Sequence, residues 1–298
     1  MSLKTTTFKR KGILLAGGSG TRLYPNTIAV SKQLIPVYDK PLIYYPLSVL
    51  MLANIRDVLL ISTQKDLKNF QNLLGDGENF GLSISYAIQD RPEGIAQAFL
   101  IGEKFIDNNQ SALILGDNIF YGSGLENILS TTSAQHNEST IFGYPVENPR
   151  RFGVASIEKG KVISIVEKPE FPLSNIAVTG LYFFDKDVCS RAKQITPSNR
   201  GELEITDLNL SYLKNSNLNI HLFGRGFAWF DTGTPEDLVD ASVFIKTIEK
   251  RQGLKICCPE EIAWNKGWID DNKLFRLAKN FQNNSYGQYL EKLLKEKH

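Results

Sequence analysis

Short apolar runs separated by helical stretches dominate the first half of the chain. Residues 11–16 and 57–62 are two such runs, and an apolar stretch with helical character at residues 46–54 lies between them. This order predicts a strand, a helix and a second strand, which together form a βαβ unit. The alternation continues with expected strands at residues 82–88 and 111–115 and expected helices at residues 95–106 and 125–135. Such alternation predicts an α/β fold whose mostly parallel, Rossmann-like sheet is covered by helices on both faces.

The pattern changes in the second half of the chain. Short alternating segments predict an inserted β lid over the strand ends, at residues 140–145, 153–157, 162–167 and 177–184. A helix is expected at residues 203–215, strands at 218–223 and 228–231, and helices from residue 235 to the end. No repeat or low-complexity linker interrupts the chain. We therefore expect one domain at residues 11–298, with a mixed-sheet core at residues 11–235 and a helical C-terminal segment at residues 236–298.

Composition narrows the possible classes of function. The 34 basic and 32 acidic residues leave a formal charge of +2, so no global field recruits nucleic acid or an anionic membrane. The most apolar stretch, residues 42–55, is shorter than the roughly 20 residues of a membrane span and contains Pro46, which favours a buried helix. Three cysteines, two of them adjacent, suit neither a disulfide framework nor a zinc site. We expect a cytoplasmic protein in which residues 1–10, which lack the apolar segment of a secretory signal, form a disordered extension.

A glycine-rich loop after the first expected strand is the main candidate for a phosphate site. It reads Leu15-Ala16-Gly17-Gly18-Ser19-Gly20-Thr21-Arg22-Leu23. Glycines let backbone N–H groups approach a phosphate, and turns after parallel strands are where open α/β sheets bind ligands. A P-loop would need a lysine after Gly20, and a dinucleotide fingerprint would need glycine in place of Leu23. The loop instead offers Arg22, with Lys32 ten residues further on, as cations for a polyphosphate; the alternative is a plain glycine turn with a solvated arginine.

The loop and the segment after it resemble the signature of a known enzyme family. Gly17-Gly18-x-Gly20-Thr21-Arg22-Leu23-x-Pro25, followed by Lys32-x-Leu34-x-Pro36-Val37, is similar to the motif of the sugar-phosphate nucleotidyltransferases. The resemblance runs from about residue 11 to residue 290 and is strongest to the branch that transfers thymidylate to glucose 1-phosphate for dTDP-rhamnose synthesis in bacteria. Further matching segments are Val37-Tyr38-Asp39-Lys40-Pro41, Gly116-Asp117-Asn118, Glu167-Lys168-Pro169, Gly201-Glu202-Leu203-Glu204 and Asp231-Thr232-Gly233-Thr234. The resemblance implies that glucose 1-phosphate attacks the α-phosphate of dTTP to give dTDP-glucose and pyrophosphate, with Mg²⁺ as cofactor, in a homotetramer.

Two expected strands end in aspartate. Asp117 follows the apolar run at residues 111–115, and Asp231 ends the run that begins at Ala228. The carboxyl ends of the strands form the ligand edge of such a sheet, and two carboxylates together with phosphate oxygens and water suit Mg²⁺. One such aspartate alone is more often a turn or helix-cap residue. Two of them, at positions that match the family's metal ligands, predict a Mg²⁺ site.

The resemblance also implies roles for individual side chains. Arg22 would stabilise the triphosphate and the departing pyrophosphate, and Lys168 would hold the sugar phosphate next to the attacked α-phosphate. Without the resemblance, Lys168 is simply a solvated strand-end lysine. Nucleotide contacts are expected from Leu15, Gly17, Gly18, Ser19, Gly20, Thr21, Lys32, Gln89, Gly94 and Asp117. Sugar contacts are expected from Asn118, Tyr144, Gly153, Glu167, Val178, Glu202 and Trp229.

Two alternative functions remain open. The first is the same chemistry on other substrates, such as uridylyl or guanylyl transfer, because the methyl group that separates thymine from uracil contributes only about 1–3 kcal/mol in a pocket. The second is a sugar-nucleotide sensor that has lost catalysis. Loss of either aspartate, or of Arg22 or Lys168, would favour the sensor, but all four residues are present.

Overall fold

The computed structural model of the protein describes residues 10–18, 20–135 and 138–296. Nine of its strands form one sheet, namely β1 Lys11–Ala16, β4 Asp57–Ser62, β5 Ser83–Ile88, β6 Ser111–Leu115, β8 Ser139–Pro145, β9 Gly153–Glu158, β10 Lys161–Glu167, β11 Ile176–Phe184 and β12 Leu218–Leu222. The order is β10-β9-β11-β6-β1-β4-β5, and β8 pairs with both β11 and β12. Two short ribbons pair β2 Pro36–Val37 with β3 Lys40–Pro41 and β7 Ile119–Gly122 with β13 Phe227–Phe230.

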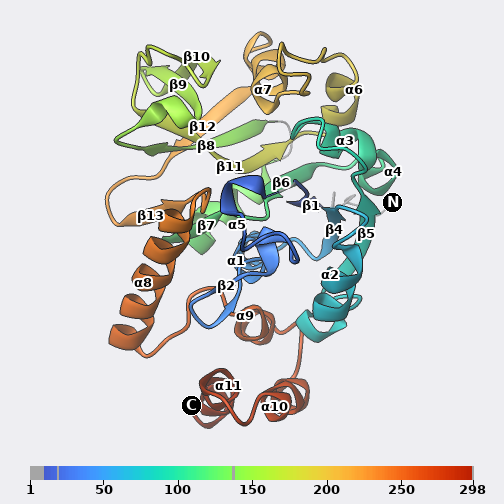
Figure 1. Ribbon diagram of the computed structural model, residues 1–298, viewed down its shortest axis with the longest axis vertical. Coiled ribbons are helices and arrows are strands. Elements are labelled where there is room, and N and C mark those ends of the chain that lie inside the picture. Colours follow the sequence, from blue (N-terminus) through green and yellow to red (C-terminus); the bar gives the residue numbers. More distant parts are fainter. Residues whose placement is uncertain (1–9, 19, 136–137, 297–298) are drawn as a thin grey trace, which may run out of the picture.

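Helices cover both faces of this sheet, which confirms the expected α/β fold (Figure 1). They are α1 Tyr44–Leu52, α2 Leu67–Leu74, α3 Gln97–Ile101, α4 Glu103–Ile106, α5 Leu125–Ala134, α6 Val188–Ala192, α7 Ile205–Leu213, α8 Pro235–Gln252, α9 Pro259–Asn265, α10 Asp271–Asn280 and α11 Ser285–Lys295. Alternate side chains of a strand point to opposite faces. Accordingly, Leu14 of β1 belongs to the core beneath α1, α2 and α5, whereas Ile13 belongs to the core beneath α3, α4 and α7.

The parallel strands place their carboxyl ends at one edge of the sheet. β1 pairs in parallel with β4 and β6, and β4 pairs in parallel with β5. The loop after β1 and the Asp117 turn after β6 therefore emerge side by side, because Leu15 is aligned with Leu115. This edge is where ligands bind in open α/β sheets.

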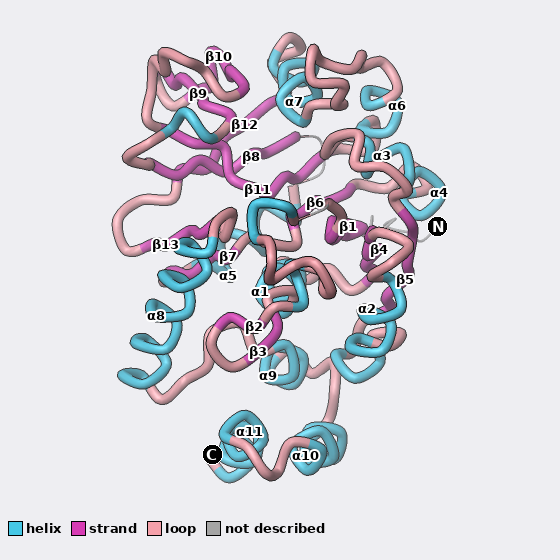
Figure 2. The backbone as a smooth tube through the Cα atoms, viewed as in Figure 1, coloured by secondary structure: helices cyan, strands magenta, loops and turns pink. Residues whose placement is uncertain are grey.

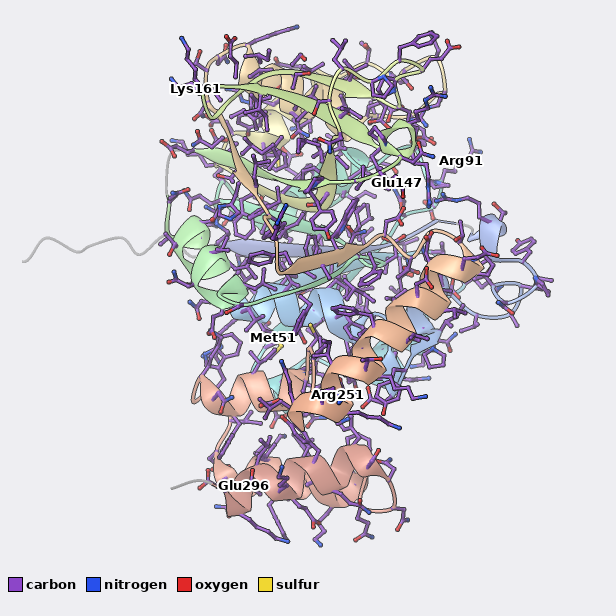
Figure 3. All side chains as sticks on the ribbon, turned by 90° about the vertical axis from the view of Figure 1, so that its left-hand side faces the viewer. Met51, Arg91, Glu147, Lys161, Arg251 and Glu296 are labelled. Carbon is purple, nitrogen blue, oxygen red and sulfur yellow. The ribbon has the colours of Figure 1, made fainter. Side chains whose placement is uncertain are left out.

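The expected β lid is only partly separate from the sheet. β11 pairs antiparallel with β6 and with β8, so these two strands extend the main sheet instead of covering it. The reason lies in the apolar run at residues 177–184, whose side chains are buried throughout, as in a central strand. Strands β9 and β10 form a hairpin at the end of this sheet. Figure 3 shows Lys161 of this hairpin at the opposite end of the molecule from Glu296, which follows α11.

Several local expectations are corrected by the structure. Arg10, assigned to the terminal extension, is buried and donates hydrogen bonds to the backbone oxygens of Ser111 (2.8 Å) and Phe184 (2.9 Å). The single helix expected at residues 95–106 is divided at Gly102. Helices α2 and α6 and the short strand β7 were not expected from the sequence.

The remaining structural expectations concern the cysteines and the apolar stretch near residue 50. Cys189, Cys257 and Cys258 are free thiols. Helix α1 is buried along almost its whole length, and Figure 3 shows its Met51 inside the molecule. Within the described part of the chain, no helix combines the length and apolar character needed to cross a membrane.

The helices that follow β13 pack on one side of the sheet and away from the hairpin (Figure 2). Helix α8 begins with a capping box, in which Thr234 accepts from the Asp237 N–H (3.2 Å) and Asp237 accepts from the Thr234 N–H (3.0 Å). Because this cap directly follows Asp231, it fixes the direction in which the chain leaves the candidate site. α9 packs against α1, and α10 and α11 pack against each other beyond it.

Candidate active site

The glycine loop has a shape that only glycine allows at several positions. Gly18 and Gly20 have φ of +96° and +59°, which L side chains rarely adopt. A side chain at Gly17 would collide with the Gln89 amide oxygen. The Thr27 hydroxyl donates to the Gly20 oxygen (2.6 Å) and closes the loop. Ser19 lies outside the described residues.

Two adjoining cavities collect the predicted nucleotide residues. A cavity of ≈ 340 Å³, called the nucleotide-side cavity after these predictions, is lined by Leu15, Gly17, Gly18, Gln89, Gly94 and Asp117, among others. A second cavity, of ≈ 240 Å³, called the loop-side cavity, is lined by the glycine loop together with Thr21, Lys32 and Asp117. Every predicted nucleotide residue within the described ranges therefore borders one of these two spaces.

The far wall of the first cavity is built by a hydrogen-bonded turn. Gln89 is buried, and its amide nitrogen donates to the Gln97 oxygen (2.6 Å), which fixes the plane of the Gln89 side chain. Gly94 has a φ of +106°, and a side chain there would collide with the Leu203 backbone. Leu203 N–H donates to the Glu93 oxygen (2.7 Å), which joins this turn to the segment before α7. The turn thus presents an oriented amide to whatever enters the cavity.

A third cavity, of ≈ 410 Å³, adjoins the other two and is called the sugar-side cavity after the predicted sugar residues that line it. Of the predicted sugar residues it is lined by Asn118, Gly153, Glu167, Val178 and Trp229. Tyr144 does not line it: its ring packs against Trp229 with 6.0 Å between ring centroids, and its hydroxyl donates to the Phe227 oxygen (3.1 Å). Glu202 borders the nucleotide-side cavity instead, 3.6 Å from Arg200.

Three side chains at these cavities were not expected from the sequence. Phe152 lines the sugar-side cavity, where its ring centroid lies 5.1 Å from that of Trp229. Arg151, beside it, pairs with Asp231 (3.4 Å) and Asp237 (3.0 Å). Arg200 borders the nucleotide-side cavity and pairs with Glu204 (2.7 Å). The only signal for these residues was their position next to predicted strands or acidic motifs, and such positions are common on any surface.

The two predicted metal ligands both contact one lysine. Lys32 Nζ donates to Asp117 Oδ2 (2.7 Å) and to the backbone oxygen of Asp231 (3.4 Å). Burial raises the pKa of Asp231; the charges of Asp237 and Asp117 add to this effect, and those of Arg151 and Lys32 oppose it. Carboxylates and cations therefore lie close together at this edge of the sheet.

The donor set fits a divalent metal that also binds ligand oxygens. Across the described ranges, no group of three or more His, Cys, Asp or Glu side chains converges as a complete metal site. Two carboxylates beside a glycine-rich loop suit Mg²⁺, which usually binds one or two protein carboxylates together with phosphate oxygens and water. Asp117 and Asp231 both border the third cavity, and Asp117 also borders the other two, so these are the two residues that would hold a metal here.

Asn118 connects the metal edge to the sugar-side wall. Its side-chain oxygen accepts from the Trp229 indole N–H (2.7 Å) and from the Gly180 N–H (3.0 Å), and its nitrogen donates to Asp117 Oδ1 (2.9 Å). A Cβ at Gly180 would lie 2.6 Å from the Asn118 oxygen, so glycine is required there. The orientation of Trp229 is thus linked through one amide to that of Asp117.

Lys168 lines both the nucleotide-side cavity and the sugar-side cavity. It follows β10 and has a φ of +42°, an uncommon conformation for a non-glycine residue that is enriched at functional sites. Its Nζ lies 3.5 Å from Glu167 Oε1, and Glu167 Oε2 accepts from the Thr206 hydroxyl (2.6 Å). Glu167 is therefore held in place while about half of the Lys168 side chain, 48%, remains exposed.

The fold and the site define a class of enzyme, and comparisons with known proteins identify the same class. Residues 11–248 match the family model described as nucleotidyl transferase. The chain belongs to this family and is a nucleotidyltransferase, as the glycine-loop signature predicted.

Individual relatives point to one branch of the family. The chain is 57% identical over 287 residues to the glucose-1-phosphate thymidylyltransferase of Neisseria meningitidis serogroup A, covering 96% of this chain and 100% of the relative. It is similar, at 41% identity and a TM-score of 0.73, to a Bacillus anthracis protein described as a glucose-1-phosphate thymidylyltransferase and crystallised with sucrose, covering 79% and 94% of the two chains. It is also similar to a UDP-glucose pyrophosphorylase in complex with UDP-glucose, at 25% identity and a TM-score of 0.71, covering 82% and 100%.

Proposed function

We propose that the protein is a glucose-1-phosphate thymidylyltransferase, which transfers dTMP from dTTP to glucose 1-phosphate and releases pyrophosphate. The structural observation that carries this proposal is that Arg22 and Asp117 border all three cavities. A cation and a carboxylate thus mark the junction of a nucleotide-side space, a loop-side space and a sugar-side space. The names of relatives that share more than half of their residues with this chain support the same reaction.

The proposed reaction requires positioning and charge neutralisation. In-line phosphoryl transfer needs no covalent protein nucleophile, because the sugar phosphate itself attacks the α-phosphate. Arg22 and Lys32, which border the loop-side cavity, would hold the triphosphate and offset the charge that develops on pyrophosphate. Asp117 and Asp231 would hold Mg²⁺, which would neutralise phosphate oxygens.

The two substrates would be read on opposite sides of this junction. Gln89 and the backbone at Gly94 would contact the base, because an amide can meet both a donor and an acceptor on the thymine edge. Glu167, held by Thr206, would accept hydrogen bonds from sugar hydroxyls, and Trp229 would cover the C–H surface of the ring.

A nucleotide panel tests the proposed function. Pyrophosphate release is measured with glucose 1-phosphate and, in turn, dTTP, UTP, GTP, CTP and ATP. We expect dTTP to give the highest kcat/KM and UTP to follow within about 10–200-fold, the ratio that one methyl group supplies. A preference for UTP would favour uridylyl transfer. This second candidate function is supported by the similarity to a UDP-glucose pyrophosphorylase. Binding of dTDP-glucose without turnover of any nucleotide would indicate a sensor instead.

The proposed assembly and location follow from the same resemblance. We propose a cytoplasmic homotetramer that supplies dTDP-glucose for dTDP-rhamnose synthesis. Light scattering coupled to size-exclusion chromatography is expected to give four times the 33.5 kDa mass of one chain. A monomer at micromolar concentration would contradict the proposed assembly.

Replacing Lys168 by alanine is expected to raise KM for glucose 1-phosphate and to lower kcat. A dianionic sugar phosphate must approach an already anionic α-phosphate, and Lys168 lies where the nucleotide-side and sugar-side cavities meet. Loss of a hydrogen bond between charged groups corresponds to about 1.5–3 kcal/mol, or roughly tenfold or more in KM. Steady-state kinetics in glucose 1-phosphate and calorimetric titration of dTTP measure the two sides of the site separately.

Lys161→Ala provides a matched control, because Lys161 lies at the other end of β10 and is exposed. This control should keep both KM values and dTTP affinity unchanged. If Lys168→Ala lost dTTP affinity while its sugar-phosphate KM stayed constant, Lys168 would belong to the nucleotide site, and its assigned role would be wrong.

A further inference from the structure

The two aspartates at the candidate metal site lie next to the two strands of one short ribbon, β7 and β13. β7 begins just after Asp117 and Asn118, and β13 ends just before Asp231. The ribbon is antiparallel, with Ile119 opposite Phe230. Continued by two more residues, this register would place Thr232 opposite Asp117.

The backbone does not continue this register, and a side chain joins the two segments instead. Thr232 has a φ of +39°, which turns the chain out of the strand direction immediately after Asp231. Its hydroxyl donates to the backbone oxygen of Asp117 over 2.7 Å. The hydroxyl thus connects Thr232, which directly follows Asp231, to Asp117, the other predicted metal ligand.

Lys32 forms a second, weaker link between the same two segments. Its Nζ reaches Asp117 Oδ2 at 2.7 Å and the Asp231 oxygen at 3.4 Å. Lys32 is also a candidate phosphate ligand, so its contacts to the aspartates compete with those to a substrate. Thr232 is fully buried and borders none of the three site cavities, so its bond to Asp117 can persist when substrates bind.

The turn at Thr232 also places the Asp231 carboxylate beside the cations of the site. A Cβ built on Gly233 would lie 3.2 Å from Asp231 Oδ2 and 3.4 Å from an Arg22 nitrogen. The carboxylate and the guanidinium therefore both lie next to the space that Gly233 leaves open. A change in the Thr232 backbone would shift this carboxylate relative to Asp117.

We propose that Thr232 is a positioning residue for the reaction, whose buried hydroxyl holds Asp117 and Asp231 at the separation that a divalent metal requires. The inference rests on the proposed function, because it assigns Thr232 to the metal site of that reaction. Thr232 does not touch a substrate; it acts through the two carboxylates. Partners of metal ligands commonly change metal affinity by about 10–100-fold when they are removed.

Three substitutions separate the hydroxyl from the backbone conformation. Thr232→Val removes the hydroxyl and keeps the branched shape, Thr232→Ser keeps the hydroxyl, and Thr232→Gly relaxes the positive φ but removes the hydroxyl. If Thr232 served only to fill space, the valine variant would behave like the natural protein and the glycine variant would lose thermal stability; if it served only to form the turn, the glycine variant would behave like the natural protein. The proposed role predicts instead that valine and glycine share one defect and that serine restores function.

The direct measurement is the affinity for Mn²⁺ of the protein–dTTP complex without glucose 1-phosphate, so that no turnover occurs. Electron paramagnetic resonance follows the free ion, with a titration of dTTP alone subtracted. We expect Thr232→Val and Thr232→Gly to bind Mn²⁺ about tenfold more weakly and Thr232→Ser to remain within about threefold of the natural protein. The Mg²⁺ concentration for half-maximal turnover should rise in the same order.

Thr247→Val is the matched control, because the Thr247 hydroxyl also donates to a backbone oxygen, that of Val243 (2.7 Å), but lies within α8 and away from the three site cavities. It should leave Mn²⁺ affinity unchanged. Unaltered Mn²⁺ affinity in Thr232→Val, or a serine variant as weak as valine, would overturn the positioning role. If the natural protein bound no Mn²⁺ beyond that held by dTTP, the metal assignment within the proposed function would itself be wrong, and the role of Thr232 would be overturned with it.

Discussion

Asp117→Asn and Asp231→Asn are each expected to reduce turnover by roughly a thousandfold while leaving the protein folded. Each substitution removes one charged oxygen from the proposed Mg²⁺ site, and metal stabilisation of phosphoryl charge is worth several kcal/mol, at about 1.4 kcal/mol per tenfold in rate. The fold should persist because asparagine keeps the size of the side chain. At Asp231, burial already opposes ionisation by raising the pKa, so removal of the charge carries little cost in stability.

Circular dichroism and pyrophosphate release over a Mg²⁺ titration measure these two effects. Asp240→Asn, on the exposed face of α8, serves as the control for loss of a single negative charge and should leave the Mg²⁺ dependence unchanged. Near-normal turnover at low Mg²⁺ in both site variants would remove Asp117 and Asp231 from the metal site. A defect in Asp231→Asn alone would instead point to its pairing with Arg151 (3.4 Å) as the function of that residue.

The parallel half of the fold was predictable because its signal is local. Strand β1 and strand β6 are short apolar runs with sharp polar ends, and both match the expected bounds closely. The loop after β1 and the aspartate after β6 must then meet at one edge, because parallel neighbours end on the same side. The convergence of Arg22 and Asp117 follows from pattern and topology alone.

The antiparallel half was less predictable because its pairings depend on distant partners. β8 and β11 read as lid segments, yet β11 pairs with β6 and so extends the main sheet. The same dependence on distant partners explains why Phe152 lines the sugar-side cavity and the predicted Tyr144 does not. Both aromatic residues lie near predicted strands, and only the packing around Trp229 decides which one faces the space.

Side chains that act through other side chains had no specific signal in the sequence. Thr232 stands next to a predicted metal ligand, but nothing in its residue type indicates a left-handed backbone or a bond to Asp117. Arg151 belongs to an adjacent pair of arginines in a loop, where a solvated surface is the ordinary expectation. Their contacts arise from tertiary packing, which brings segments more than 75 residues apart in sequence into contact.

Arg22→Ala is expected to lower kcat by roughly 10²–10³-fold, the usual loss when a group that stabilises developing charge is removed. Arg22 borders all three cavities, at the point where the leaving pyrophosphate would gain charge. Its role should be larger in the transition state than in the ground state, so kcat should change more than the affinity for dTTP. Arg22→Lys should rescue only part of the rate, because a compact ammonium replaces a planar guanidinium that can hold two oxygens at once.

The structure also predicts that Arg22→Ala leaves stability almost unchanged. Arg22 is exposed, and within the described ranges it forms no hydrogen bond or ion pair, so its removal should alter the free energy of unfolding by at most about 0.5 kcal/mol. Arg150→Ala is the matched control, because Arg150 is an exposed arginine that borders none of the three cavities. Thermal denaturation and steady-state kinetics on the three variants decide between the roles. A large fall in melting temperature with kcat intact would make Arg22 a structural residue of the loop. Equal losses of kcat in Arg22→Ala and Arg150→Ala would show that Arg22 acts only through general electrostatic attraction of the triphosphate.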